Sequence, residues 1–257
     1  MAERLFDYFT HEDAEALTSD DSGRVRGSTV KISRLVKSIA AGGEGKVYSV
    51  NVKQGGKART FAVKDFSHEG HARIAFERYQ MLKKYRISHI LPTYRIVEGK
   101  NRILMTHLNI DGKVAISVFA NHHQRAPRHD IKLESIDEEV VSNILNSFEE
   151  DLMIAFKNNI EILMDAYMCT LPKKLRGKLE FDDEKGIPLE IYIADMGSII
   201  EENQNGSREN PHTFGMFLIN IFRNFLPPKE LEKINNIIDV WVAKMSEKFD
   251  SISPNEK

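Results

Sequence analysis

The sequence predicts an α+β protein whose N-terminal part is rich in strands and whose C-terminal part is rich in helices. Residues 31–66 carry β-branched, partly alternating segments separated by Gly-rich turns, which is the pattern of an antiparallel sheet. Residues 135–249 contain long stretches in which apolar positions recur with the period of an amphipathic helix. We therefore expect a sheet followed by a mostly helical part.

Composition and charge exclude several classes of protein. A chain of 257 residues, 41% hydrophobic and 29% charged, is typical of one large globular domain or of two lobes. The formal net charge of -2 argues against a protein that binds nucleic acid through its overall charge. We find no secretory signal and no apolar run of membrane-spanning length, so we expect a cytoplasmic protein without a membrane partner. A signal-independent route of secretion stays open.

The first hundred residues predict the element order β-β-β-α-β-β. The expected elements cover residues 30–41, 46–52, 60–66, 68–85, 90–98 and 102–109. Short turns between the strands favour antiparallel pairing. The helix is expected to bury Ile74, Phe76, Tyr79, Met81 and Leu82. Residues 1–30 are expected to form a short helix or an ordered arm and then a linker.

The second half predicts three helices and one hairpin. Ser135 and Glu138 have the spacing of a capping box, and an apolar stripe then runs from Val141 to Leu163. The hairpin is expected to join two strands through a polar turn, and two apolar helices separated by Pro227-Pro228 are expected after it. The two hairpin strands and the two helices are expected at residues 177–181, 187–195, 212–226 and 228–249.

The turn after the first predicted strand contains Gly42, Gly43 and Gly45. Glycines allow backbone N–H groups to approach a phosphate without an intervening side chain. An ordinary hairpin turn would have the same composition, so this feature alone leaves both interpretations open.

Lys64 lies nineteen residues after Gly45, in the apolar predicted strand Phe61–Lys64. A buried lysine needs a partner of opposite charge, and Glu77 on the following helix is a suitable one. The alternative is a solvated lysine at the edge of the sheet.

These features in order resemble the protein-kinase superfamily, whose signature is G-x-G-x-x-G-x-V, V-A-I-K, a helix glutamate, a catalytic-loop aspartate and D-F-G. Ala40–Val47 matches the first motif with Ala40 in place of the first glycine, and Phe61–Lys64 matches the second. Glu77 resembles the helix glutamate. His89–Tyr94 resembles the approach to the fourth strand, and Ile103–Leu108 resembles the fifth strand and hinge with Met105 as gatekeeper.

The resemblance implies a bilobal kinase-like fold that binds ATP and Mg²⁺ between its lobes. Residues 1–30 would be an arm, and 31–108 an N-lobe with a five-stranded antiparallel sheet and one helix. Residues 109–257 would be a reduced, mostly helical C-lobe. The residues expected to contact the nucleotide are Gly42, Gly43, Gly45, Val47, Ala62, Lys64, Glu77, Met105, Thr106, His107 and Leu108.

In the C-terminal part the resemblance rests on two aspartates. Ile193–Gly197 resembles D-F-G with Met196 for phenylalanine, so Asp195 is expected to hold Mg²⁺. A plain turn that begins with an aspartate is the alternative. Asp165 has the position of the catalytic-loop aspartate, which takes the proton of the acceptor hydroxyl. Lys64 is the second expected catalytic residue and would act on the phosphates. The H-R-D sequence is absent, and Asp165 could simply end a helix. Thr170 stands in place of the family's Mg²⁺-binding asparagine and is therefore expected to bind Mg²⁺ there.

The region after Gly197 departs further from the family. Only a short segment separates Gly197 from Asn210, A-P-E is absent, and Asn210 replaces the aspartate that begins a later helix. The resemblance implies an ATP-dependent phosphotransferase, a divergent Ser/Thr protein kinase that phosphorylates a hydroxyl. A small-molecule kinase, a nucleotide-binding pseudokinase that acts as an interaction module, and an unrelated α+β binding protein are the alternatives.

Overall fold

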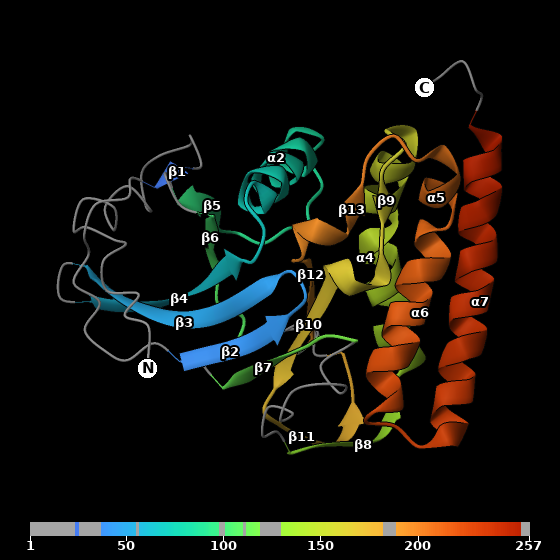
Figure 1. Cartoon of the computed structure of the whole chain (residues 1–257). Coiled ribbons are helices and arrows are strands. Elements are labelled where there is room, and N and C mark those ends of the chain that lie inside the picture. Colours follow the sequence, from blue (N-terminus) through green and yellow to red (C-terminus); the bar gives the residue numbers. More distant parts are fainter. Residues whose placement is uncertain are drawn as a thin grey trace. The chain divides into compact units, whose positions relative to one another are not determined.

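Six strands form one sheet in the N-terminal part of the chain (Figure 1), in the order β1-β5-β6-β4-β3-β2. The strands are β1 (Arg24–Val25), β2 (Lys37–Gly42), β3 (Gly45–Gln54), β4 (Lys57–Phe66), β5 (Tyr94–Val97) and β6 (Arg102–Thr106). All pair antiparallel except β1, which pairs parallel to β5. The β3–β4 register runs from Gly45 opposite Phe66 to Gln54 opposite Lys57. These two ten-residue strands are the longest of the sheet, and they pair along their whole length.

The computed structural model describes residues 24–25, 37–54, 57–97, 101–109, 112–118, 130–181 and 189–252. The chain divides into two compact units. The first runs to Met81 and includes Leu91–Ile110, and the second comprises Leu82–Ile90 and the chain from Asp111 onward. Of the predicted arm, β1 is described and the remaining residues lie outside the described ranges. Across the described residues, we find no helix both long and apolar enough to cross a membrane.

The predicted order β-β-β-α-β-β is confirmed by β2, β3, β4, α2 (His71–Lys84), β5 and β6. The buried face of α2 consists of Ala72, Ala75, Phe76, Tyr79 and Leu82. Ile74 is 41% exposed, so its predicted place in the core is wrong: in the actual helix register Ala72 and Ala75 face inward in its stead.

The second unit combines short strands with a layer of helices (Figure 1). The elements are β7 (Lys113–Ile116), β8 (Asp130–Ile136), α4 (Glu138–Lys157), β9 (Glu161–Ile162), η2 (Met164–Ala166), β10 (Tyr167–Pro172), β11 (Lys174–Leu179), β12 (Glu190–Ile193), η3 (Met196–Ser198), β13 (Ile199–Ile200), α5 (Gln204–Arg208), α6 (Asn210–Arg223) and α7 (Pro228–Ser251). The helices α4, α6 and α7 pack together through aromatic side chains. Phe148 of α4 stacks on Phe214 of α6, and Phe156 of α4 stacks on Phe249 of α7, with ring centroids 4.2 and 4.1 Å apart.

Both ends of α4 differ from the prediction. Ser135 and Ile136 belong to β8, because β8 continues its pairing with Lys178 and Leu179 of β11. The helix begins at Glu138 after Asp137, which makes no side-chain capping bond, so the predicted capping box is wrong. The helix ends at Lys157, and Glu161–Ile162 then forms a strand instead of continuing the predicted stripe to Leu163.

The hairpin predicted for residues 177–195 is also wrong. Strand β11 pairs parallel with β8, and β12 pairs antiparallel with β10. The two strands flanking the predicted turn thus join different sheets. The turn residues, Asp182–Gly186, lie outside the described ranges. Periodicity indicates a strand but does not choose its partner, which here comes from distant sequence.

Gly215 tests the packing of α6 on α7. A Cβ at Gly215 would lie 2.5 Å from Cγ2 of Ile238, a branched side chain with little room to turn. We expect Gly215→Val to lower the free energy of unfolding by about 2 kcal/mol, the typical cost of overpacking. Urea unfolding of the full chain measures this, with His212→Val on the exposed side of the same helix as control. Equal midpoints for both variants would contradict the close packing.

Candidate active site

The two aspartates predicted from sequence lie in neighbouring segments of the second unit. Asp165 is the middle residue of η2, and Asp195 directly precedes η3. The strand β9 leads into η2 and pairs antiparallel with β13, which follows η3, with Ile162 opposite Ile199. The two short helical turns are therefore held by the same pair of strands.

Backbone hydrogen bonds join these two segments directly. The carbonyl of Ala166 accepts from the N–H groups of Ala194 and Asp195, at 2.8 and 3.2 Å. The N–H of Leu163 donates to the carbonyl of Ser198 at 3.1 Å. Ala166, which follows Asp165, is thus bonded to Asp195 and to Ala194, which precedes Asp195. These bonds fix the backbone that carries both carboxylates.

The two carboxylates differ in their surroundings. Oδ1 of Asp195 accepts from the N–H of Gly197 at 3.0 Å, so this side chain caps η3 and is half-buried. This is the turn role that the sequence offered as an alternative, and it also fixes the direction of the carboxylate. Asp165 is exposed, and no hydrogen bond or ion pair joins its carboxylate to another residue of the described ranges.

Asn210, the first residue of α6, anchors the strand that precedes Asp165. Its Oδ1 accepts from the N–H of Ile162, and its Nδ2 donates to the carbonyl of Ile160, both at 2.8 Å. The side chain is fully buried. These bonds join residues almost fifty positions apart in the sequence. The sequence around Asn210 therefore does not indicate them, and shows only that the asparagine precedes an apolar helix.

Thr170 does not fit its predicted role as a Mg²⁺ ligand. It is buried in β10, and its hydroxyl donates to Oε2 of Glu190 at 3.2 Å. Strand β10 begins two residues after Asp165, so Thr170 is a strand residue with an engaged hydroxyl. The adjacent Cys169 is fully buried, and burial, followed by the charge of Glu190, raises the pKa of its thiol. A nucleophilic role for this cysteine is therefore disfavoured.

In the first unit the predicted phosphate turn is a two-residue hairpin. Gly42 pairs with Gly45, and Gly43 and Glu44 form the tip. A Cβ at Gly45 would collide with the backbone carbonyl of Asp65 on β4, so sheet packing alone requires glycine there. A Cβ at Gly43 would meet no described atom within 4 Å. Packing therefore explains the glycine at position 45 but does not explain the one at position 43.

Lys64 is buried on β4, as its apolar strand predicted, but its observed partner differs from the prediction. Its Nζ lies 2.8 Å from Oε2 of Glu44 at the hairpin tip. Glu77 lies on the exposed side of α2, with 61% of its side chain exposed, and it forms an ion pair with Arg73 at 3.9 Å. Glu44 was missed because pairing across a hairpin depends on strand register, which the sequence does not display.

The remaining predicted nucleotide contacts gather around β4 and β6. Ala62 of β4 pairs with Met105 of β6, and Val47 of β3 pairs with Lys64. Strand β6 ends at Thr106, and Nδ1 of the following residue, His107, accepts from the N–H of Asn109 at 3.1 Å. The described residues place Leu108 in the bend after His107.

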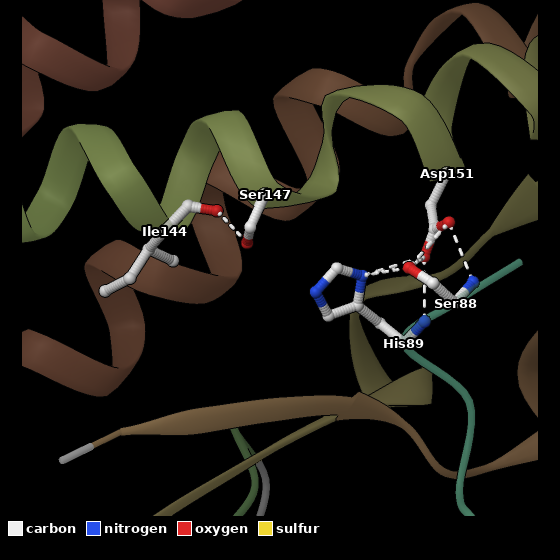
Figure 2. Close-up of polar contacts among 5 residues, drawn as sticks. All are labelled: Ser88, His89, Ile144, Ser147 and Asp151. Carbon is white, nitrogen blue, oxygen red and sulfur yellow. Dashed lines mark hydrogen bonds and ion pairs between the residues drawn. The ribbon is translucent and has the colours of Figure 1, made fainter. Parts of the chain in front are cut away.

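A buried carboxylate that the sequence did not reveal fastens the segment after α2. Asp151 of α4 is 1% exposed and accepts from the N–H groups of Ser88 and His89 at 2.8 and 2.9 Å (Figure 2). It also lies 3.1 Å from Oγ of Ser88 and 2.8 Å from Nδ1 of His89. Figure 2 shows that the nearby Ser147 bonds within its own helix, to the carbonyl of Ile144. Burial favours a higher pKa for Asp151, but the bonds from His89 and Ser88 outweigh it and lower the pKa.

The comparisons with known proteins concern the fold alone. No family model and no curated protein matches the sequence. Among solved structures the chain is similar to two double mutants of the PknI kinase domain of Mycobacterium tuberculosis, each at 15% identity. One match covers 87% of this chain and 89% of that chain with a TM-score of 0.41, and the other covers 84% and 93% with 0.40.

Both TM-scores are low, and no residue of this chain receives a role from these matches. The order of the chain's own strands and helices supports the fold assignment more strongly than these matches do. The α+β class and the strand and helix order of the first unit are those predicted for a protein-kinase-like fold. The fold is kinase-like in this sense.

Removing the Asn210 anchor is expected to destabilise the second unit. Asn210→Ala leaves a buried N–H and a buried carbonyl of the chain around β9 without partners, which costs about 3 kcal/mol. Urea unfolding measures the change, and Asn205→Ala on the exposed side of α5 is the matched control. A loss no larger than that of the control would show that the anchor is unimportant.

The lowered pKa of Asp151 makes its contribution to stability dependent on pH. A carboxyl whose pKa is lower in the folded state stabilises the fold above its unfolded pKa, near 3.8, and this contribution disappears as the pH falls through the folded value. We expect Asp151→Asn to cost about 3 kcal/mol near neutral pH, and the difference from wild type to narrow below about pH 4. Glu150→Gln, one residue earlier and exposed, should show neither effect. A difference from wild type that is constant from pH 7 to about pH 3 would refute the proposed linkage.

Proposed function

We propose that this chain is a divergent Ser/Thr protein kinase that transfers the γ-phosphoryl group of ATP to a hydroxyl. The observation that carries the proposal is the pair of aspartates on η2 and η3, whose backbones are bonded to each other and framed by β9 and β13. An aspartate that only begins a turn does not need a second aspartate on the adjoining segment. Two carboxylates on adjoining rigid segments suit a reaction that depends on positioning and on neutralisation of charge.

Each proposed site residue has a distinct task. Lys64 would contact the α- and β-phosphates, and the backbone of Gly42–Gly45 would cover them. The Lys64–Glu44 pair supports this, because it ties the lysine to the tip of the same turn. The other proposed nucleotide contacts are Val47, Ala62, Glu77, Met105, Thr106, His107 and Leu108.

Asp195 is the proposed Mg²⁺ carboxylate. Its fixed direction fits a metal ligand, and Mg²⁺ bound to a nucleotide needs only one or two protein carboxylates besides the phosphates. The described ranges contain no group of three or more acidic, histidine or cysteine residues suited to a metal. When bound, Mg²⁺ would neutralise charge on the phosphates. Thr170 is not among the proposed ligands, because it is buried and its hydroxyl is bonded to Glu190.

Asp165 would act on the acceptor. Its carboxylate would accept a hydrogen bond from the acceptor hydroxyl and take the proton as the oxygen bonds to the γ-phosphorus and the bond to the β-phosphate oxygen breaks. The exposure of Asp165 supports this task, because an acceptor from solution must reach it.

A nucleotide-binding pseudokinase is the second candidate. The engaged hydroxyl of Thr170 favours it, because the position of the second Mg²⁺ ligand is then held by a structural side chain. A small-molecule acceptor instead of a protein is favoured by the short path from η3 through α5 to α6. Transfer assays with protein and with small hydroxyl compounds distinguish these outcomes.

Thermal unfolding with and without ATP and Mg²⁺ tests the nucleotide site. A ligand that binds only the folded state stabilises it by about 2.7 kcal/mol at a hundredfold excess over its Kd. We expect a Mg²⁺-dependent rise in Tm for wild type that Lys64→Ala and Asp195→Ala abolish. Exposed residues away from the proposed site give the controls Lys83→Ala and Glu134→Ala, which should respond like wild type.

Phosphoryl transfer from radiolabelled ATP then tests catalysis. Loss of transfer in Asp165→Ala with an unchanged Tm rise would support the kinase. A Tm rise without transfer in wild type would favour the pseudokinase. Absence of any rise at millimolar ATP would exclude both nucleotide-binding candidates.

A further inference from the structure

The outer face of α7 exposes a large apolar side chain at its centre. Val240 is 72% exposed, although α7 buries Ile234, Ile238, Trp241, Met245 and Phe249 against the second unit. Figure 1 shows α7 at the border of the helical layer. Such exposure of a β-branched residue in mid-helix favours neither solubility nor helix formation, and a partner that covered Val240 would remove it from water.

The surface beside Val240 is hollowed. Ile237 and Val240 of α7, with Lys233, Asn236 and Glu138 at the rim, line a shallow depression. It adjoins a second hollow between α7 and the start of α4 whose apolar lining includes Val141 and Ile234. The exposed valine is thus part of a continuous, partly apolar face and is not isolated.

We infer that this face of α7 binds the same face of a second copy of the chain, with the two helices antiparallel and Val240 on the two-fold axis. The side chains of Lys233, Asn236, Ile237, Ala243, Lys244 and Glu247 lie within about 60° of Val240 around the helix. Antiparallel packing on a two-fold axis places residues equally far before and after Val240 opposite each other.

The charges at the two ends of this face are complementary under that symmetry. Lys233 and Glu247 are each seven residues from Val240, so Lys233 of each copy would meet Glu247 of the other. Both side chains are exposed. Within one chain these two residues lie about 21 Å apart along the helix and cannot interact. Lys233 has a local partner in Glu230 at 2.7 Å, which leaves its other donors available.

The apolar residues fit the same arrangement. Ile237 and Ala243 are each three residues from Val240 and point about 60° to either side of it, so Ile237 of one copy and Ala243 of the other would lie at the same level, on the two flanks of the contact. The small side chain of Ala243 allows the two helices to approach closely at this level. Near the valine pair the contact thus combines these apolar residues with the polar pair of Asn236 and Lys244, each four residues from Val240, and its ends are charged.

Sedimentation equilibrium of the full chain tests this pairing by charge reversal. Wild type should form dimers. Lys233→Glu and Glu247→Lys should each weaken the dimer about tenfold or more, because each creates two pairs of like charge. Both substitutions in one chain should restore the dimer, and so should an equimolar mixture of the two single variants. Val240→Glu should give monomers with little change in unfolding, since the side chain is already exposed.

The charge reversals Lys132→Glu and Glu134→Lys on the exposed face of β8 are the controls and should dimerise like wild type. A wild-type chain that stays monomeric at all accessible concentrations would overturn the inference. So would dimers that none of the α7 substitutions weakens, or single variants whose mixture fails to recover the wild-type affinity.

Discussion

The pairing of β9 with β13 is the constraint on which the candidate site depends. It aligns two stretches more than thirty residues apart, and the bonds of Ala166 and Leu163 extend this alignment to the aspartates. Asn210 then fastens β9 to the start of α6, and the packing of α6 on α4 and α7 holds that helix in the core. The carboxylates are therefore held in place by the packed helices of the second unit, although both lie in short turns.

The buried carboxylate of Asp151 fastens the segment after α2 to α4. Residues Leu82–Ile90 begin in the last turn of that helix and continue past it, and they belong to the second unit. Two backbone N–H groups and two side chains of Ser88 and His89 converge on one carboxylate, a number of donors that compensates a charge removed from water. His89 also stacks on Phe148, with ring centroids 3.9 Å apart, so polar and aromatic contacts support the same tie.

Local features of this fold could be predicted from the sequence, whereas features set by distant partners could not. Alternation and turns gave the order of the strands around α2, and an apolar strand gave the burial of Lys64. Its partner Glu44, the separation of β11 from β12, and the early end of α4 depend on which strands pair, and periodicity contains no such information. Asp165 and Asp195 could be proposed because motifs place them in order along the chain. The bond of Thr170 to Glu190 follows from the β10–β12 register and had no signal.

The contact between Gly45 and the Asp65 carbonyl changes what evolutionary comparison can reveal about the hairpin of β2 and β3. Any homologue that keeps this strand spacing must keep glycine at position 45, whether or not it ever meets a nucleotide. Invariance there would reflect selection for folding alone. Position 43 has open space around it, so drift toward larger residues is permitted by the scaffold. Persistence of glycine at 43 across lineages would therefore be the informative trace of a ligand, and its loss would mark lineages that have abandoned one.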